Sequence, residues 1–454
     1  MLFRSIQNEL LRWCEKTNRK PLVLRGARQV GKTTVINQLA SHFKNYIYLN
    51  LEKESDSGFF ENHSNVNELV SAIYFAHGKS QDNKTLLFID EIQEYPKAIN
   101  MLRYFYEERP EIYVIAAGSM LETLFESDLS FPVGRVEYMV LRPISFYEFV
   151  KAKAPANRED IFKTIPIPKY AIETLFKEFH EYALVGGMPE IVSQYIKEQD
   201  LVKIQPIYDS LINGYLDDVE KYAKDKKSAT LYRLLIRQAF LEAGNRITFQ
   251  NFGNTKLDYR QVSETLRGLE KALLINLIYP VTNTEIPFQP NHKRSPKLQV
   301  IDTGLMAHQL GIQQNILGIN DLNSIYKGIF IEHLVGQELL SGQFNALSAL
   351  NFWVREKKTS MAEVDYVLNF KGKIIPIEVK SGAAGKLRSL HQFMEEAPHE
   401  MAIRFYAGEI RIDNVKTSSD KEYKLLSLPY FLAFQVREYL EWFETTLNQE
   451  TQNI

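Results

Sequence analysis

The sequence contains almost no cysteine, no histidine cluster and no long apolar run. Its one cysteine, Cys14, excludes a disulfide framework and a cysteine zinc site and is typical of a reducing compartment. The nine histidines are scattered without metal-ligand spacing. The N-terminus is broken by charge, unlike a signal peptide, and runs such as 86–89 are too short to cross a bilayer. We therefore expect a cytoplasmic protein with no membrane partner.

Net charge is also nearly absent. A formal charge of −2 over 454 residues leaves no overall field to attract nucleic acid, so any such binding must come from local patches. The hydrophobic fraction of 45% and the charged fraction of 24% are those of an ordinary soluble globular protein. A chain of this length is too long for a single core and predicts roughly two to four domains.

A phosphate-binding loop stands near the start of the chain. A short apolar strand, 21–25, ends at a glycine, and a helix is expected to begin at Lys32. The pattern between them is G-x-x-x-x-G-K-T, in which Gly26 and Gly31 let backbone N–H groups curl around an anion. Lys32 is expected to neutralise the β- and γ-phosphates of ATP, and Thr33 to ligate Mg²⁺. The expected nucleotide-binding residues are Gly26, Ala27, Arg28, Gln29, Val30, Gly31, Lys32, Thr33 and Thr34.

Two acids at the end of a second apolar strand predict hydrolysis. Residues 86–89 form an uninterrupted apolar run, typical of a parallel strand covered by helices on both faces, and Asp90 and Glu91 follow it. Asp90 is expected to hold Mg²⁺ through its water shell, and Glu91 to polarise the attacking water. A kinase function is disfavoured because this pair of acids is arranged to activate water.

A third apolar strand, 112–117, leads into Gly118 and Ser119. Ser119 stands where a polar residue can sense the γ-phosphate or orient water, and it fits equally well as the N-cap of a following helix. Alternating strands and helices, with ligand groups at the strand ends, predict an α/β fold. Its parallel sheet is expected to bind the nucleotide at the carboxyl edge.

Four segments of the sequence resemble a prokaryotic family of AAA-type P-loop ATPases. They are 26–34, 87–93, 117–119 and 134–149, the last of which contains the run Pro-Ile-Ser-Phe-Tyr-Glu-Phe. Members of that family carry a C-terminal domain of unknown function with a restriction-endonuclease-like core, and the resemblance covers nearly the whole chain. Given this resemblance, Arg135 is the best candidate for an arginine that reaches a γ-phosphate. The alternative is that Arg135 is a surface arginine paired with a carboxylate.

The middle of the chain is predicted to be helical and then winged-helix-like. The run Gly-Gly-Met-Pro at 186–189 marks a tight turn and not a second phosphate loop. Helices at 231–241 and 258–270 are expected to precede strands at 274–279 and 297–301. The loop between these strands holds His292, Lys293, Arg294 and Lys297. The second helix is expected to enter a DNA groove and the loop to touch phosphate. The alternative is that this winged-helix-like region only packs between domains.

A predicted hairpin brings together a second set of candidate catalytic and metal-binding residues. Taking Lys371 and Gly372 as the centre of a two-residue turn places Asp365 opposite Glu378 on one face of the ladder. Directly opposed Cβ atoms lie about 5 Å apart, so the two carboxylates repel unless a cation lies between them. The same register places Glu363 opposite Lys380.

This is the D…E-x-K arrangement of restriction-endonuclease-like nucleases. Asp365 and Glu378 are expected to hold Mg²⁺, which lowers the pKa of a water, and Lys380 to stabilise charge. Glu332, in a helix expected at 326–340, resembles the acid that the first helix of such folds contributes.

The expected division is an AAA-type ATPase domain at 1–150, a helical lid or connector at 151–205, a winged-helix-like domain at 206–315 and a restriction-endonuclease-like α/β domain at 320–454. We expect an ATPase, with ATP and Mg²⁺ as cofactors, whose nuclease-like domain binds or cleaves nucleic acid such as DNA. The alternative is a nucleotide-dependent switch or scaffold whose inactive nuclease-like domain binds a protein partner. Whether Arg135 acts within its own subunit or across a homo-oligomer interface stays open.

Overall fold

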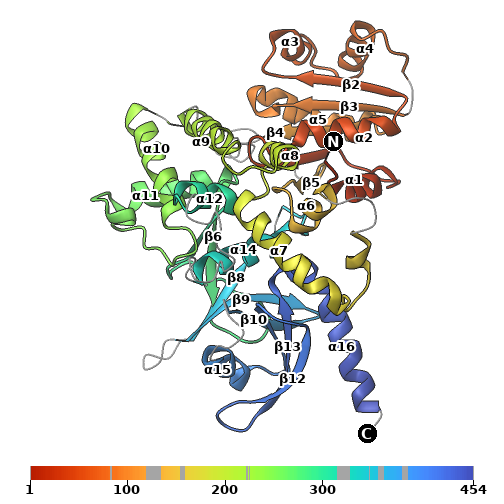
Figure 1. Ribbon diagram of the computed structural model, residues 1–454. Helices are drawn as coiled ribbons and strands as arrows, with labels where there is room; N and C mark the ends of the chain where they lie inside the picture. The colour runs from red at the N-terminus through yellow and green to blue at the C-terminus, as the bar shows by residue number, and fades with distance from the viewer. Residues whose placement is uncertain are drawn as a thin grey trace.

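The computed structural model of the protein describes residues 2–81, 84–118, 134–153, 159–220, 223, 225–313, 328–346, 348–355, 362–380 and 387–452. The fold is α/β, with a five-stranded sheet at one end of the molecule, part of an eight-stranded sheet at the other, and helices between them (Figure 1). Within the described residues, the helices lack the length and apolar character that crossing a bilayer requires.

The N-terminal sheet is parallel throughout, as predicted, and has the strand order β2-β3-β4-β1-β5. All six residues of β3 are buried, because alternate side chains such as Phe88 and Leu87 enter separate cores on the two faces of the sheet. The strands are β1 (Leu22–Arg25), β2 (Asn45–Asn50), β3 (Thr85–Asp90), β4 (Tyr113–Gly118) and β5 (Glu137–Val140). The helices of this part are α1 (Ile6–Cys14), α2 (Lys32–Leu39), α3 (Glu54–Asn62), α4 (Val66–Ala76) and α5 (Pro96–Glu108).

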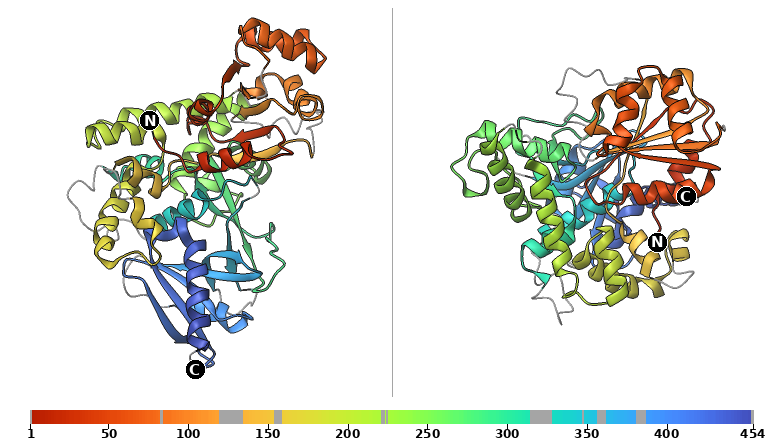
Figure 2. Two further views of the ribbon diagram at one scale, coloured as in Figure 1. Left: turned by 90° about the vertical axis from the view of Figure 1, so that its right-hand side faces the viewer. Right: turned by 90° about the horizontal axis from the view of Figure 1, so that it is seen from above.

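The middle of the chain is helical. Its helices are α6 (Phe146–Lys153), α7 (Lys169–Val185), α8 (Pro189–Glu198), α9 (Gln205–Glu220), α10 (Lys226–Leu241), α11 (Tyr259–Lys271) and α12 (Thr303–Gln309). The predicted turn at 186–189 separates α7 from α8, since Gly186 has a φ of 70° and Pro189 opens the next helix. Seen from above in Figure 2, the green helices α9–α11 lie beside the red five-stranded domain.

The second sheet has the order β12-β13-β11-β10-β9-β8-β6-β7. Its hairpin turns at Lys371 and Gly372, both with positive φ (48° and 79°), and pairs Ile377 with Tyr366, which confirms the predicted register. The strands are β6 (Ile275–Val281), β7 (Lys297–Val300), β8 (Asn351–Val354), β9 (Glu363–Phe370), β10 (Lys373–Val379), β11 (Met401–Tyr406), β12 (Arg411–Lys416) and β13 (Glu422–Pro429). The helices of this part are α14 (Ile329–Ser341), α15 (Arg388–Glu396) and α16 (Val436–Gln452).

The helices and strands expected for the winged-helix-like region are present as α10, α11, β6 and β7. The two strands form an antiparallel pair, but β6 also pairs in parallel with β8. The hairpin is therefore the edge of the eight-stranded sheet and does not project as a free wing. The sheet itself crosses the boundary that was expected between residues 315 and 320.

One hydrophobic core runs from α1 to α16, with buried residues such as Ile6 and Tyr439 at its ends. Aromatic rings join the two halves of the chain: the centroid of Phe146 lies 6.1 Å from that of Phe431, and Tyr147 stacks on Phe434 at 5.7 Å. The N-terminal part and the C-terminal part are therefore packed against each other.

The last helix begins several residues after the proline that follows the apolar run of β13. Pro429 ends strand β13, residues Tyr430–Gln435 form a 3₁₀ helix, and α16 starts only at Val436. The apolar residues at the start of this 3₁₀ helix are buried, and short apolar runs do not distinguish a strand from a buried helical segment.

Candidate functional site

The phosphate loop lies at the carboxyl edge of the five-stranded sheet, between β1 and α2. Gly31 has a φ of 94°, a conformation that side chains rarely adopt. A Cβ atom on Gly26 would stand 2.7 Å from the carbonyl oxygen of Leu141, so this glycine permits a close backbone approach. Helix α2 begins at Lys32 and presents its N-terminus to the loop. The strand, loop and helix are therefore present in the predicted order.

Lys32 is buried within the loop. Its Nζ donates to the carbonyl oxygens of Gly26 at 2.9 Å and Ala27 at 3.0 Å. Burial lowers the pKa of Lys32, and the neighbouring acids Glu91 and Asp90 oppose that shift. The lysine and the two predicted acids therefore share one site.

Thr33 and Asp90 meet beside the loop. The Thr33 hydroxyl donates to Asp90 Oδ2 at 2.8 Å, and the Tyr48 hydroxyl donates to the same oxygen at 3.3 Å. Burial raises the pKa of Asp90, and the hydrogen bond from Thr33 lowers it. A hydroxyl and a carboxylate side by side are what a protein offers Mg²⁺ at a nucleotide site, where phosphates and water supply the other ligands. These residues fit the predicted Mg²⁺.

Glu91 stands at the end of β3 in a left-handed conformation, with a φ of 51°. Such a conformation costs a non-glycine residue about 1 kcal/mol or more and is frequent at functional sites. Its N–H donates to Asp90 Oδ1 at 3.1 Å, and its Oε2 accepts a hydrogen bond from Gln93 Nε2 at 2.5 Å. Gln93, for which sequence analysis predicted no role, therefore orients the Glu91 carboxylate.

Ser119, which was predicted as a sensor, lies outside the described residues. Arg135, the other remaining predicted residue of this domain, does not join the site. Arg135 is exposed, and its Nε pairs with Glu107 Oε1 at 2.8 Å. It precedes β5, whose first residue Glu137 pairs in parallel with Leu22, so Arg135 stands at the amino edge of the sheet, opposite the phosphate loop. This placement matches the alternative of a surface arginine paired with a carboxylate, and action on the nucleotide of a neighbouring subunit stays a prediction.

Two residues outside the nucleotide motifs hold the phosphate loop from other elements. Asp218 of α9 forms an ion pair with Arg28 Nη1 of the loop, and the Tyr215 hydroxyl donates to the Arg28 carbonyl oxygen at 3.2 Å. Sequence analysis missed Asp218 because no local pattern relates a helix acid to a loop 190 residues away.

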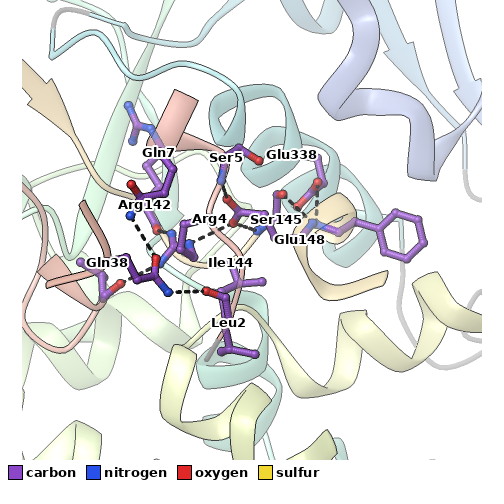
Figure 3. A network of polar contacts seen from close by, with 12 residues as sticks. Leu2, Arg4, Ser5, Gln7, Gln38, Arg142, Ile144, Ser145, Glu148 and Glu338 are labelled. Atoms are coloured by element: carbon purple, nitrogen blue, oxygen red, sulfur yellow. Dashed lines mark hydrogen bonds and ion pairs between the residues drawn. The ribbon is translucent and has the colours of Figure 1, made fainter. Parts of the chain in front are cut away.

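A buried network connects the phosphate loop to the C-terminal part of the chain (Figure 3). Arg4 donates from Nη1 to the Val30 carbonyl oxygen at 2.9 Å and from Nε to Glu148 Oε2 at 3.2 Å. Glu148 also accepts from the Ser145 N–H at 3.1 Å, while its own N–H donates to Ser145 Oγ at 3.2 Å. This reciprocal pair is a capping box, and it explains why the Ser-Phe-Tyr-Glu sequence starts α6.

The network continues into α14 through Glu338. Glu338 is fully buried; its Oε2 accepts from the Phe146 N–H at 3.1 Å, and its Oε1 lies 2.8 Å from the Tyr182 hydroxyl oxygen. The Tyr182 hydroxyl also lies 2.8 Å from the Ile144 carbonyl oxygen, to which it donates. Burial raises the pKa of Glu338 to about 8, so a protonated Glu338 donates to Tyr182 at neutral pH.

Replacing Glu338 with glutamine tests this protonation. The amide reproduces the protonated acid, since its NH₂ donates to Tyr182 and its oxygen accepts from Phe146. The unfolded carboxyl titrates near 4.5 and the folded one near 8, so wild-type stability falls as the pH rises between these values. From pH 6 to pH 8 we expect the wild type to lose up to about 2 kcal/mol more than E338Q, measured from denaturation midpoints. Parallel losses in both proteins would show that Glu338 is already ionised.

The predicted acids of the C-terminal part do lie together. The cluster consists of Glu332 on α14, Glu363 and Asp365 on β9, and Glu378 on β10. Burial, with a further contribution from Asp365, raises the pKa of Glu332 and of Glu378 to about 8. Asp365 Oδ2 accepts from the Val379 N–H at 2.7 Å, and the Lys380 amine forms an ion pair with Glu378 Oε1.

The observed position of Lys297 differs from the expected one. It was expected in a phosphate-contacting basic loop, but it is buried among the acids, with its Nζ 2.6 Å from Glu332, 2.9 Å from Glu363 and 3.8 Å from Asp365. Across the described residues, no three His, Cys, Asp or Glu side chains are grouped to hold a metal ion. The ammonium of Lys297 lies beside three of the four acids, Glu332, Glu363 and Asp365, so these acids are not free to take up Mg²⁺ as the cluster is arranged.

Comparison with protein families agrees with the N-terminal geometry. A model described as an AAA domain matches residues 18–150, so this part of the chain is an AAA-type P-loop ATPase domain, which binds nucleotide. Two models described as domains of unknown function match residues 176–316 (DUF8612) and 327–429 (DUF4143). Neither description names a nuclease. A search of curated proteins finds no match.

Two solved structures are distantly similar to this chain. The Walker-type ATPase PABY2304 of Pyrococcus abyssi is 15% identical over 68% of this chain and 96% of its own, with a TM-score of 0.44. PCH-2 of C. elegans is 18% identical over 44% of this chain and 65% of its own, with a TM-score of 0.28.

Proposed function

We propose that the protein is an ATP-hydrolysing switch whose AAA domain controls the C-terminal part of the chain. The observation that carries this proposal is the joint placement of Lys32, Thr33, Asp90 and Glu91 at one edge of the parallel sheet. The same site is tied to α14 by the buried network around Arg4 and Glu338.

Each group has a role in the proposed reaction. The backbone N–H groups of 26–34 cradle the phosphates, and Lys32 neutralises the β- and γ-oxygens. Thr33 and Asp90 would hold Mg²⁺, which, when bound, neutralises charge on the leaving phosphates. Glu91, oriented by Gln93, polarises the attacking water.

We also propose roles in this reaction for Ser119 and Arg135, although these proposals do not rest on an observed contact at the site. Ser119 follows β4, which lies between β1 and β3, so it serves as the sensor at that strand end. Arg135 stands exposed at the opposite edge, where it is available to the nucleotide of a second copy in a homo-oligomer.

The C-terminal part is proposed to recognise nucleic acid or a protein partner through a restriction-endonuclease-like core. The β9–β10 hairpin supports this fold because its register places Asp365, Glu378 and Lys380 as in such nucleases. A winged-helix-like unit of α10, α11 and the β6–β7 pair would add Arg260 and Arg267, both exposed on α11, as phosphate contacts. The non-cleaving scaffold is a second candidate, and the ammonium of Lys297 within the acidic cluster favours it.

Steady-state ATP hydrolysis by the purified full-length protein tests the proposal. Wild type is expected to release phosphate from ATP in Mg²⁺, and K32A to lose both nucleotide binding and turnover. K44A, which removes a lysine beyond the helix that follows the loop, is the matched control and should hydrolyse ATP normally. Equal turnover by K32A and wild type would contradict the assigned site.

A further inference from the structure

Lys297 reaches the acidic cluster from a different part of the chain than the acids do. It is the first residue of β7, at the edge of the sheet, whereas the acids lie on α14, β9 and β10. Its Nζ stands 2.6 Å from Glu332 Oε1 and 2.9 Å from Glu363 Oε1. Lys297, which contacts these acids, is therefore not part of the hairpin motif.

The ammonium group is fixed in this position. The Lys297 side chain is 6% exposed, its Nζ lies 4.8 Å from the centroid of the Phe352 ring, and its backbone bridges to Arg246. Arg246 also pairs with Glu363 Oε2 at 3.2 Å. Because β7 is hydrogen-bonded to β6, Lys297 cannot withdraw as a free loop residue.

Charge in the cluster is compensated without a metal. Four acids, on Glu332, Glu363, Asp365 and Glu378, face three cations, on Arg246, Lys297 and Lys380, and the raised pKa of Glu332 and Glu378 reduces the negative charge further. Carboxylates this close repel unless something cationic lies between them, and Lys297 supplies that charge to three of the four. A divalent ion entering this space would have to displace the ammonium.

One oxygen atom of the cluster, Oε2 of Glu378, is a candidate ligand for a cation. Glu378 is 4% exposed, and its Oε2 has no hydrogen-bond partner within the described part of the chain. A buried carboxylate oxygen without a partner is costly in a protein interior and demands an explanation. Replacing Lys297 with an uncharged residue would leave this oxygen beside Asp365 and Glu332, two acids that would then have lost their shared cation.

We propose that Lys297 takes the place of a divalent metal ion in this cluster, and that the cluster is a latent metal site which replacement of Lys297 by an uncharged side chain opens. The C-terminal part is then held together by an internal cation and binds its target without metal-dependent cleavage. This goes beyond the ATPase proposal and does not depend on it.

Titration of the nucleotide-free, full-length protein with Mn²⁺ tests this, with free Mn²⁺ followed by electron paramagnetic resonance. The variants are K297M, the matched K297R, which keeps the charge, and the double variant K297M/E378Q. Beyond any Mn²⁺ held at Thr33 and Asp90, we expect wild type and K297R to lack a Mn²⁺ site, K297M to gain one at least about tenfold tighter than any residual binding, and the double variant to lose it.

Two outcomes would overturn the proposal. A Mn²⁺ site in wild type that D365N removes would mean that Lys297 does not replace the metal. A folded K297M that gains no site would make Lys297 an ion-pair partner only. If K297M does not fold, the wild-type and D365N titrations still decide whether the native cluster holds a metal, and K297Q repeats the gain-of-site measurement with a smaller loss of side-chain volume.

Discussion

Replacing Glu91 with glutamine is expected to lower the turnover of ATP roughly 100- to 10,000-fold while ATP still binds. The amide keeps the size of the side chain and its hydrogen bond to Gln93, but it cannot accept a proton from the attacking water. The phosphate loop, Thr33 and Asp90 are unchanged, so the affinity for ATP should stay within a few-fold of wild type. Single-turnover hydrolysis and nucleotide-binding measurements separate the two effects.

Glu94 provides a control for this variant. It lies three residues further on, in the short helix Ile92–Glu94, and is exposed. E94Q removes the same charge from the same segment and should hydrolyse ATP at the wild-type rate. Turnover by E91Q within a few-fold of wild type would assign water activation to another residue.

Replacing Arg4 with methionine is expected to cost about 3–5 kcal/mol of stability. The Arg4 and Glu148 side chains are 6% and 5% exposed, so their ion pair is shielded from solvent. Arg4 also donates to the carbonyl oxygens of Val30 and Arg142. The methionine leaves a buried carboxylate without its cation and the loop carbonyl without its donor. The measurement is the shift of the chemical or thermal denaturation midpoint.

An exposed pair on helix α1, which begins just after Arg4, is the comparison. Arg12 pairs with Glu9 at 2.6 Å, but its side chain is 72% exposed. R12M should therefore cost no more than about 1 kcal/mol. If R4M is as stable as R12M, the Arg4–Glu148 pair does not hold the loop to α6.

The sequence was sufficient where local chemistry dictates the structure. Glycines at 26 and 31, the acids after β3, and the Lys371-Gly372 turn each allow few conformations, so the loop, the strand end and the hairpin register could be predicted. The parallel sheet followed from apolar runs that have to be covered on both faces.

Long-range partners could not be predicted in this way. Lys297 looked like a member of a basic loop because His292, Lys293 and Arg294 precede it, yet sheet pairing buries it among acids far away in sequence. Arg4 and Asp218 likewise act on the phosphate loop from elements without a motif. Strand β12, with mostly exposed and half-exposed residues, has no apolar signal, since it lies at the sheet edge.

The same limits apply to Arg135. Its place after a Gly in an ATPase-like segment suggested a phosphate contact, but strand order decides which edge of the sheet it occupies. Because β5 runs parallel to β1, a residue that precedes β5 lies at the end opposite the loop that follows β1. Sequence spacing alone does not contain that information.

Hydrogen exchange of α14 in the E91Q variant, with and without ATP and Mg²⁺, tests most directly the claim that the nucleotide site controls the C-terminal part. We predict that ATP changes the protection of Ile329–Ser341, because Glu338 is joined to the phosphate loop through Phe146, Glu148 and Arg4. Helix α15, which has no residue in that network, should be unaffected. Unchanged protection of α14 with ATP bound would contradict the account.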